Sequence, residues 1–582
     1  MFRYGFFTIA AALVALLATG EARADFIVYK VGAAPECPFH TIQEAVDAAA
    51  AHPGIDLVWI AMDQQYTDQH VVVTDQDVII EGGFTDCFDN DPASDQTTIG
   101  GTSGHSVFEI EGTSNVVLGN MIITGAVMDE SQSGGGIYFG GQGSLILQTA
   151  WVFQNQAGYG GGIDVSPTGP TEVTLIGSVV SSNTALVSGG GIRIEGETTL
   201  NVKHSPPDQF DFVTHNTALG QGETGYGGGI EVLGPAVLRF AAVLAQNSAP
   251  YGAGIAALAT EHGSAYAGVY TTNPASPGAI YENVASRTGG GVFLKPHAPS
   301  GHQSQMCAHG FDIHSNTAEN GAAIYADLDD DSGSSVDLNP IDPHVVCGLD
   351  SVECAAGVAC NRVDDNVATD GAIVLVQSKG TFLASHLSMR ANQANALVGE
   401  LTDDATLVRL SNCLLAENTS FGPLIDAYTT GDLHVGSGLI LDSCTLAGNT
   451  IGAPDVIHGQ VSGFTLTNSI VDQIGEGTVD GLVFPPTVHY VLSNDVSTLP
   501  SSDDVVQGVP TFVDFDHGDY HLQQASLGVD FAPAELVAFD LDGNPRSVDL
   551  IDVNNVWGPM DLGAYEVQGD HVADPIFSSG FD

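Results

Sequence analysis

Several side chains that could do chemistry directly follow copies of a recurring Gly-Gly-Gly-aliphatic motif. The residues after successive copies are Tyr138, Asp164, Arg193, Glu231, Ala256, Phe293, Tyr325 and Val374. If the copies stack as neighbouring strands, Asp164 and Glu231 lie two strand spacings, about 9–10 Å, apart. That separation is near the ~6.5–9.5 Å between the general acid and general base of an inverting glycosidase. Glu195, two residues after Arg193, is a third candidate catalytic acid.

Arg193 gives the same row a second interpretation, which the residues favour. An arginine between two stacked acids neutralises both of them, as cross-strand pairing of opposite charges favours. The positive charge also lowers the pKa of each carboxyl group, which makes a poor general acid. Tyr138 and Arg193 are then candidate binding residues rather than parts of a catalytic site.

A second motif recurs through the middle of the chain and indicates which elements position this row. It consists of an aliphatic residue, two variable residues, Asn, one variable residue and usually Ala. Its asparagines are Asn155, Asn183, Asn216, Asn247, Asn283, Asn316, Asn366 and Asn392, with looser copies at Asn418 and Asn449. The interval between copies varies above a common minimum, which indicates a fixed structural unit that carries loops of different length.

The segments between these motifs are short, β-prone and bounded by Gly or Asn, as in Val173-Thr174-Leu175. They lack helical periodicity and hairpin turns, so we predict an all-β, single-stranded parallel β-helix, or solenoid. Equivalent residues of successive coils would stack at ~4.8 Å. We expect the asparagines to form an internal ladder that bonds to the corner backbone, because a buried corner must satisfy its polar groups.

These repeats resemble those of the polymorphic outer membrane proteins, which pair an aliphatic-x-x-Asn box with a Gly-Gly-small-aliphatic box. They are also similar to the broader pectin-lyase-like superfamily of right-handed parallel β-helices. The resemblance covers roughly residues 100–460 and implies the fold, but this solenoid carries both adhesins and carbohydrate enzymes. Motifs of the polygalacturonases are incomplete here, since Arg193-Ile194-Glu195 ends in an acid where that family has Lys.

The N-terminal region combines an export signal with a predicted cap. Residues 1–24 have a basic start, an apolar run and a small-x-small cleavage site, which is typical of a signal peptide. Residues 25–100 are predicted to form a cap and the first coils, with a short helix that begins at a capping box of Thr41 and Glu44. The repeats then occupy residues 101–510, and no later segment is apolar enough to span a bilayer.

The C-terminal residues are predicted to form a cap module, 511–567, and a tail, 568–582. The module contains Asp519-Tyr520-His521-Leu522 and Asp561-Leu562-Gly563-Ala564-Tyr565-Glu566, which resemble the closing module of secreted bacterial β-helix proteins. The last residues, Asp574 to Asp582, are similar to short tails of exported gammaproteobacterial proteins, which implies a sorting signal. Asp540, Asp542 and Asn544 alternate as oxygen ligands do in a calcium loop, although the position of the usual twelfth ligand is Ile551. A turn stabilised by the Asp side chains is the alternative to calcium.

Eight cysteines in an exported chain favour disulfides. Cys37 and Cys87 are the expected N-terminal pair, and Cys413 and Cys444 are expected to face each other across neighbouring coils. The other four form a loop-rich cluster: Cys307, Cys347, Cys354 and Cys360. A metal site of Cys307 with nearby histidines (His297, His302, His309 and His314) is an alternative, but the spacing matches no zinc signature.

The net charge of the chain limits the classes of partner that it can bind. With 13 Lys+Arg against 70 Asp+Glu, the formal net charge is −57, which excludes a nucleic-acid partner. We therefore expect a non-catalytic, extracellular or cell-surface protein, adhesin-like or glycan-contacting, with a polysaccharide or a neighbouring cell surface as partner. A carbohydrate-active enzyme, either a polysaccharide lyase or a glycoside hydrolase, and a passive structural stalk are the alternatives. Calcium is the one cofactor that the acidity suggests.

Overall fold

The fold is seen in a computed structural model of the chain. It describes residues 26–203, 211–272, 277–296, 301–326, 334–338, 354, 357, 359–377, 380–402, 406–429, 437–473, 477–482, 484–534 and 539–569. The predicted signal peptide, 1–24, and nearly all of the predicted sorting tail lie outside these residues. Within them, no helix has the length and apolar character that crossing a membrane requires.

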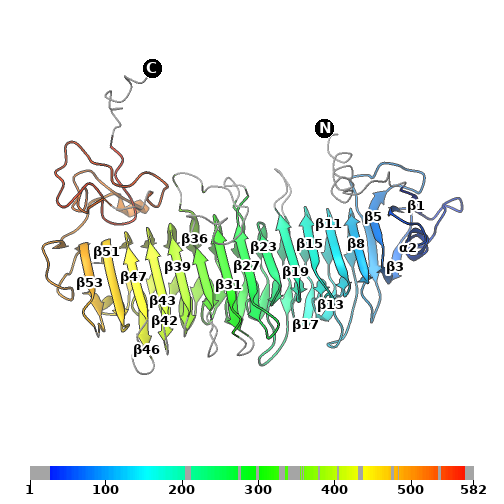
Figure 1. Ribbon diagram of the computed structural model, residues 1–582, viewed down its shortest axis with the longest axis horizontal. Helices are drawn as coiled ribbons and strands as arrows, with labels where there is room; N and C mark the ends of the chain where they lie inside the picture. Colours follow the sequence, from blue (N-terminus) through cyan, green and yellow to red (C-terminus); the bar gives the residue numbers. More distant parts are fainter. Residues whose placement is uncertain are drawn as a thin grey trace, which may run out of the picture.

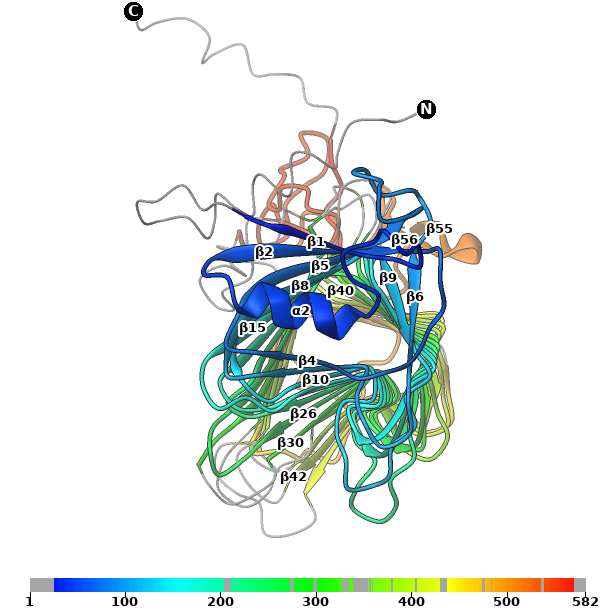
Figure 2. The same ribbon diagram turned by 90° about the vertical axis from the view of Figure 1, so that its right-hand side faces the viewer.

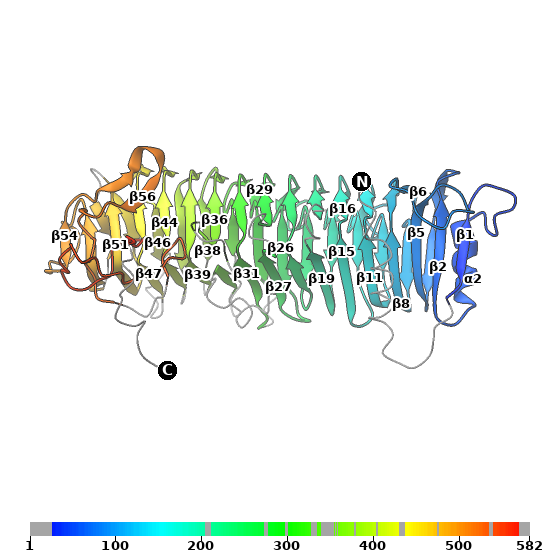
Figure 3. The ribbon, with the colours of Figure 1, turned by 90° about the horizontal axis from the view of Figure 1, so that it is seen from above.

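The chain forms a parallel β-helix, as predicted, in which strands of successive coils stack along one long axis (Figures 1 and 3). One face, here called sheet B, has a single strand from each coil. Its strands, in spatial order, are β4 (Val71–Thr74), β7 (Phe108–Glu111), β10 (Ile137–Phe139), β14 (Ile163–Val165), β18 (Ile192–Ile194), β22 (Ile230–Leu233), β26 (Ile255–Ala259), β30 (Val292–Pro296), β34 (Ile324–Ala326), β38 (Ala372–Gln377), β42 (Ala396–Thr402), β46 (Ile425–Thr429), β50 (Asp455–Gly459) and β52 (Gly477–Asp480).

A second face, sheet C, directly precedes sheet B in each coil. Its strands are β13 (Gln156–Tyr159), β17 (Thr184–Ser188), β21 (Thr217–Ala218), β25 (Ser248–Tyr251), β29 (Val284–Thr288), β33 (Thr317–Ala318), β37 (Val367–Ala368), β41 (Gln393–Ala394), β45 (Thr419–Ser420) and β49 (Thr450–Ile451). The remaining strands of the coils belong to one large sheet, sheet A.

Sheet A has two arms, so that most coils contribute two strands to it. The first arm begins at β1 (Val28–Val31) and continues through strands such as β15 (Thr171–Ile176) and β31 (Ser304–His309). The second begins at β3 (Tyr66–Gln69) and continues through β12 (Trp151–Phe153) and β48 (Thr445–Ala447). The ten-residue strand β51 (Gly463–Asp472) pairs with both arms and joins them near the C-terminal end.

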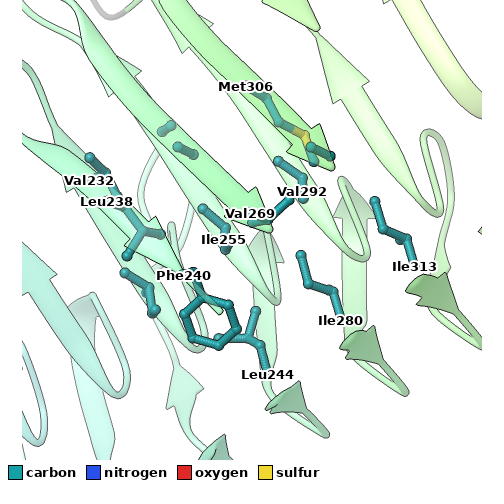
Figure 4. Close-up of a cluster of buried hydrophobic side chains, with 14 of the residues drawn as sticks. Val232, Leu238, Phe240, Leu244, Ile255, Val269, Ile280, Val292, Met306 and Ile313 are labelled. Atoms are coloured by element: carbon teal, nitrogen blue, oxygen red, sulfur yellow. The ribbon is translucent and has the colours of Figure 1, made fainter. Parts of the chain in front are cut away.

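The core consists of the inward side chains of all these strands, which stack on their counterparts in the next coil. Figure 4 shows this stacking for residues such as Ile255 and Val292, which are fully buried and directly paired in sheet B. Inside the coils, one cluster of buried apolar side chains extends from Val31 to Leu499. Each coil therefore buries its apolar side chains only against its neighbours, which is why the chain needs a repeated sequence.

The predicted asparagine ladder is present at the corner between the second arm of sheet A and sheet C. In a typical coil, the Asn183 side chain donates to the carbonyl of Val152 (2.9 Å) and to Oδ1 of Asn216 (3.0 Å). Oδ1 of Asn216 also accepts the backbone N–H of Asn183 at 3.0 Å. The same contacts continue from Asn155 to Asn449. The residue before each Asn turns the corner with a positive φ, such as +57° at Ser182.

The glycine triplets have two separate physical causes. Gly160, the first of its triplet, has a φ of +55°, a conformation that favours glycine. A Cβ on Gly161, the second, would lie 2.4 Å from the backbone of Thr184 in the next coil. The triplet therefore allows the chain to turn from sheet C into sheet B and allows adjacent coils to approach closely.

The N-terminal end of the solenoid is covered by helix α2 (Ile42–Ala50), which lies across the open end (Figure 2). Its predicted capping box is present, with Thr41 and Glu44 each bonding the other's backbone N–H. The disulfide Cys37–Cys87 also occurs as predicted. The covered end keeps the first strands from pairing with other chains.

The C-terminal module lies along the side of the last coils, beside the second arm of sheet A (Figure 1). It contains the antiparallel pair β55 (Phe512–Asp514) and β56 (Asp519–Leu522). Its apolar residues pack on the outer face of sheet A at Leu414, Ala447 and Ile470. The module thereby covers apolar sheet surface that would otherwise face solvent.

Some of the remaining cysteines form disulfides, and others are free thiols. Cys354 and Cys360 form a disulfide, and Cys307 is also disulfide-bonded, in the region where a cluster was predicted. Cys413 and Cys444 do stack on neighbouring coils, but they are buried free thiols. The Cys413 thiol donates to the carbonyl of Ala384 and the Cys444 thiol donates to the carbonyl of Leu410, so these thiols satisfy corner backbone groups as polar side chains do elsewhere.

The hydrogen bonds of the ladder predict that replacing an interior asparagine lowers the free energy of unfolding more than replacing a terminal one. Asn283→Ala removes two donors and an acceptor from a fully buried corner, and we expect a loss of about 3–5 kcal/mol because each orphaned polar group costs about 1–3 kcal/mol. Asn449→Ala, at the half-buried end of the ladder, should cost about 1 kcal/mol, because water replaces the lost contacts. Denaturant unfolding followed by circular dichroism measures both variants, and equal losses would contradict the ladder as the source of stability.

Candidate functional site

The predicted row of side chains lies on the outer face of sheet B, one residue per strand. Strand pairing places Asp164 beside Arg193, and Arg193 beside Glu231. The row continues through Phe293 to Tyr325, as expected. At the next strand the prediction is wrong.

The residue beside Tyr325 is Leu375, whereas Val374 points into the core. The triplet before Ile373 is degenerate, and Ile373 does not occupy the position that Ile324 has in the preceding coil. Val374 takes that position, so the motif alone assigned the register one residue too early.

Arg193 is the centre of a compact ionic network. Its Nη1 donates to Oδ1 of Asp164 at 3.0 Å, and its Nη2 donates to Oε2 of Glu195 at 2.6 Å. Its Nε lies 3.4 Å from Oε2 of Glu231. The structure thus brings all three predicted acids to one arginine.

The two acids of the row are inaccessible to a large substrate. Asp164 is fully buried and Glu231 is 3% exposed, whereas 36% of the Glu195 side chain is exposed. Burial raises the pKa of Asp164, and it raises the pKa of Glu231 to about 7 despite the nearby guanidinium. Burial also opposes the charge of Arg193, but Asp164 and Glu231 together hold its pKa above the usual value.

Three further residues, which were not among the predicted site residues, complete the network. Ser166 donates to Asp164 at 2.7 Å, and Ser188 donates to Glu231 at 2.6 Å. The guanidinium carbon of Arg193 lies 5.1 Å from the centre of the Tyr159 ring. Tyr159 and Ser188 share a signal that could have found them, because each directly precedes a glycine triplet and they pair with each other in sheet C.

An aromatic cluster adjoins this network along the long axis. Tyr226 and Tyr251 stack with ring centres 5.1 Å apart, and Phe293 and Tyr325 stack at 5.3 Å. The exposed Arg287 donates to the Tyr251 hydroxyl at 3.0 Å. Because Tyr138 and Tyr159 lie on the other side of Arg193, aromatic rings flank the charged network along the coil axis.

This arrangement suits contact with a ligand better than acid–base catalysis. A general acid must reach the atom that it protonates, but Asp164 and Glu231 are covered and their charges are directed at Arg193. Tyr138, Tyr159 and Glu195 are the partly exposed groups. Partly exposed tyrosine rings and a carboxylate are groups that stack on sugars or accept their hydroxyl hydrogen bonds.

The predicted calcium residues lie in the C-terminal module, far along the chain from sheet B's charged network. Oδ1 of Asp540 accepts the backbone N–H groups of Asp542 (3.1 Å) and Asn544 (2.7 Å), and Oδ2 accepts that of Glu566 (3.1 Å). Oδ2 of Asp542 contacts Nε2 of His521 at 2.8 Å. These oxygens hold a turn together, which is the geometry of the alternative to a calcium loop.

No protein-family model matches the chain, and no curated protein is significantly similar to it. The function is therefore inferred from the geometry of the site.

Removal of the arginine is predicted to be strongly destabilising. Arg193→Met leaves two buried carboxylates without their counter-charge, which should cost about 3–5 kcal/mol at neutral pH. The loss should shrink as the pH falls below 7, because burial raises the pKa of both stranded acids and they then bind protons. Glu195→Gln removes only a partly exposed contact and should cost about 1 kcal/mol or less. Denaturant unfolding at several pH values measures these effects, and a pH-independent loss in Arg193→Met would argue against the ionic network.

The raised pKa of Glu231 predicts a specific pH dependence of the stability of the chain. Its pKa is about 7 in the folded chain against the usual 4.5, so the folded state binds more protons between these values and stability falls as pH rises through them. Glu231→Gln removes this dependence. The stability of the variant relative to the parent chain should therefore increase from pH 4.5 to pH 7 and then become constant. Trp151→Phe, on sheet A, is a control that should give a constant offset; a constant offset in Glu231→Gln would contradict the raised pKa.

Proposed function

We propose that this chain is a non-catalytic, exported or cell-surface protein whose β-helix contacts a glycan through the outer face of sheet B. The observation that carries the proposal is the state of the two row acids, which are buried and neutralised by Arg193 instead of open to a substrate. The disulfides are compatible with an extracellular location.

The geometry of the face also supports an extended ligand. Strand pairing carries the row from Tyr138 through Phe293 to Tyr325 over successive strands at ~4.8 Å, so that these three rings lie on one line, with Tyr138 partly exposed and the other two buried. Because sheet strands are hydrogen-bonded on both sides, the positions of these side chains are rigid and little ordering is needed on binding. A neutral glycan fits this face best, since the strongly negative chain repels acidic polymers.

A carbohydrate-active enzyme is the second candidate. One observation favours it, namely the pKa of about 7 of Glu231, which suits a general acid at neutral pH. Such an enzyme would need Arg193 to move away from Glu231 when substrate binds. The two candidates therefore differ in whether products form.

The test is a panel of neutral and acidic polysaccharides in which binding and sugar release are recorded together. Tyr138→Ala should weaken binding about fivefold or more, because a lost ring contact is worth about 1 kcal/mol. Trp151→Ala removes an aromatic side chain, 46% exposed, from sheet A and should leave binding unchanged.

Product release that disappears in Asp164→Asn or Glu231→Gln would replace the binding proposal by the enzyme. Absence of both binding and products across the panel would instead leave a structural stalk as the function.

A further inference from the structure

A second group of reactive side chains lies on the first arm of sheet A, away from sheet B. His309, the last residue of β31, is 3% exposed and lies beside Cys354 and Cys360. One ligand atom from each of the three residues lies within 4.8 Å of the other two. The two cysteines are joined as a disulfide in this state.

The spacing of the histidine and the nearer cysteine matches a tetrahedral zinc site. Zinc binds thiolate sulfur at about 2.3 Å and imidazole nitrogen at about 2.0–2.1 Å, so two such ligands at a tetrahedral angle lie about 3.6 Å apart. Nε2 of His309 lies 3.6 Å from Sγ of Cys354. Two cysteines and one histidine are also a ligand set that zinc uses, with water in the fourth position.

We propose that His309, Cys354 and Cys360 form a redox-gated zinc site, closed as a disulfide and open to the metal when reduced. A dithiol reductant supplies two electrons and two protons, so that the Cys354–Cys360 bond becomes two thiols and the dithiol becomes a cyclic disulfide. Zn²⁺ then replaces the two thiol protons, and His309 supplies the third ligand through Nε2. In the oxidised state the sulfurs are bonded to each other and cannot bind the metal.

The position of the site gives the exchange a structural consequence. Gly357, which lies between the two cysteines in sequence, contacts the C-terminal module, because its backbone N–H donates to the carbonyl of Asp542 at 2.8 Å. A zinc ion bound to both thiolates and to His309 would keep Cys354 and Cys360 linked after the disulfide opens. The cross-link would therefore persist under reducing and oxidising conditions alike.

Of the four histidines that the sequence suggested, His297 lies outside the described residues, and His309 and His314 have different surroundings. Among them, His314 stacks on Tyr281 with ring centres 4.9 Å apart and does not belong to the cluster. His309 comes close to cysteines that lie far along the chain, which no short zinc motif could indicate. His314 thus provides a matched control on the same sheet.

The test compares the full chain before and after reduction with dithiothreitol, which is removed without air before titration with Zn²⁺ and, as a spectroscopic probe, Co²⁺. The reduced chain should bind one additional zinc ion tightly and give the visible absorption of tetrahedral thiolate-bound cobalt, and the oxidised chain should not. His309→Gln keeps both cysteines and should weaken zinc binding about tenfold or more with a changed cobalt spectrum. His314→Gln should behave as the parent chain does.

Two results would overturn the site: equal zinc binding by the oxidised and reduced chains, or an unchanged cobalt spectrum in His309→Gln. The double variant Cys354→Ser/Cys360→Ser should lose the reduction-dependent binding, and Cys37→Ser/Cys87→Ser should retain it. Circular dichroism of each variant shows whether it is folded. If a cysteine variant does not fold, His309→Gln still tests the proposal.

Discussion

Backbone polar groups at the corners of a buried coil must be bonded without water, and the rest of this solenoid depends on how that is achieved. The asparagine side chain bonds to the preceding coil through both its amide and its oxygen. The Asn183 amide donates to the carbonyl of Val152 in the preceding coil. In the next coil, Oδ1 of Asn216 accepts both the backbone N–H and the side-chain amide of Asn183. Where a second corner lacks asparagine, other side chains take the acceptor role. Ser178 accepts the N–H of Ala150, and Ser469 accepts that of Cys444. Each coil therefore has its position set by polar contacts as well as by the apolar core.

The fixed stacking explains how a charged network can exist on a sheet. Because each coil advances by one strand spacing, any residue type at the row position meets its counterpart in the neighbouring coils. Asp164 and Glu231 would repel each other and lose hydration if they were placed there alone. Arg193 between them supplies the opposite charge, and Ser166 and Ser188 supply further hydrogen bonds. The result is a rigid surface whose exposed groups are tyrosine rings and one carboxylate.

The terminal segments cover different surfaces of the solenoid. At the N-terminal end, helix α2 covers the open coil and the Cys37–Cys87 bridge ties the covering segment down. At the other end, the C-terminal module lies along the side of the coils and covers apolar residues of sheet A. Its buried Arg546 donates to the carbonyls of Asp561 and Gly563, within the module. The module is thus folded by its own polar contacts and fixed in place by the sheet that it covers.

The sequence by itself determined the parallel β-helix, the asparagine ladder and the helical cap, because each depends on a residue type that recurs at a fixed place or on a local capping contact. It also placed Asp164, Arg193 and Glu231 in one row, since the glycine triplets set the register wherever they are intact. The degenerate triplet before Ile373 could not do so, and Val374 was therefore assigned to the wrong face. Only the tertiary structure decided that the row acids are buried, that Tyr159 lies against Arg193, and that His309 meets Cys354. Those contacts join residues of different coils, loops and sheets, and their distances depend on how the whole chain winds, which no local pattern contains.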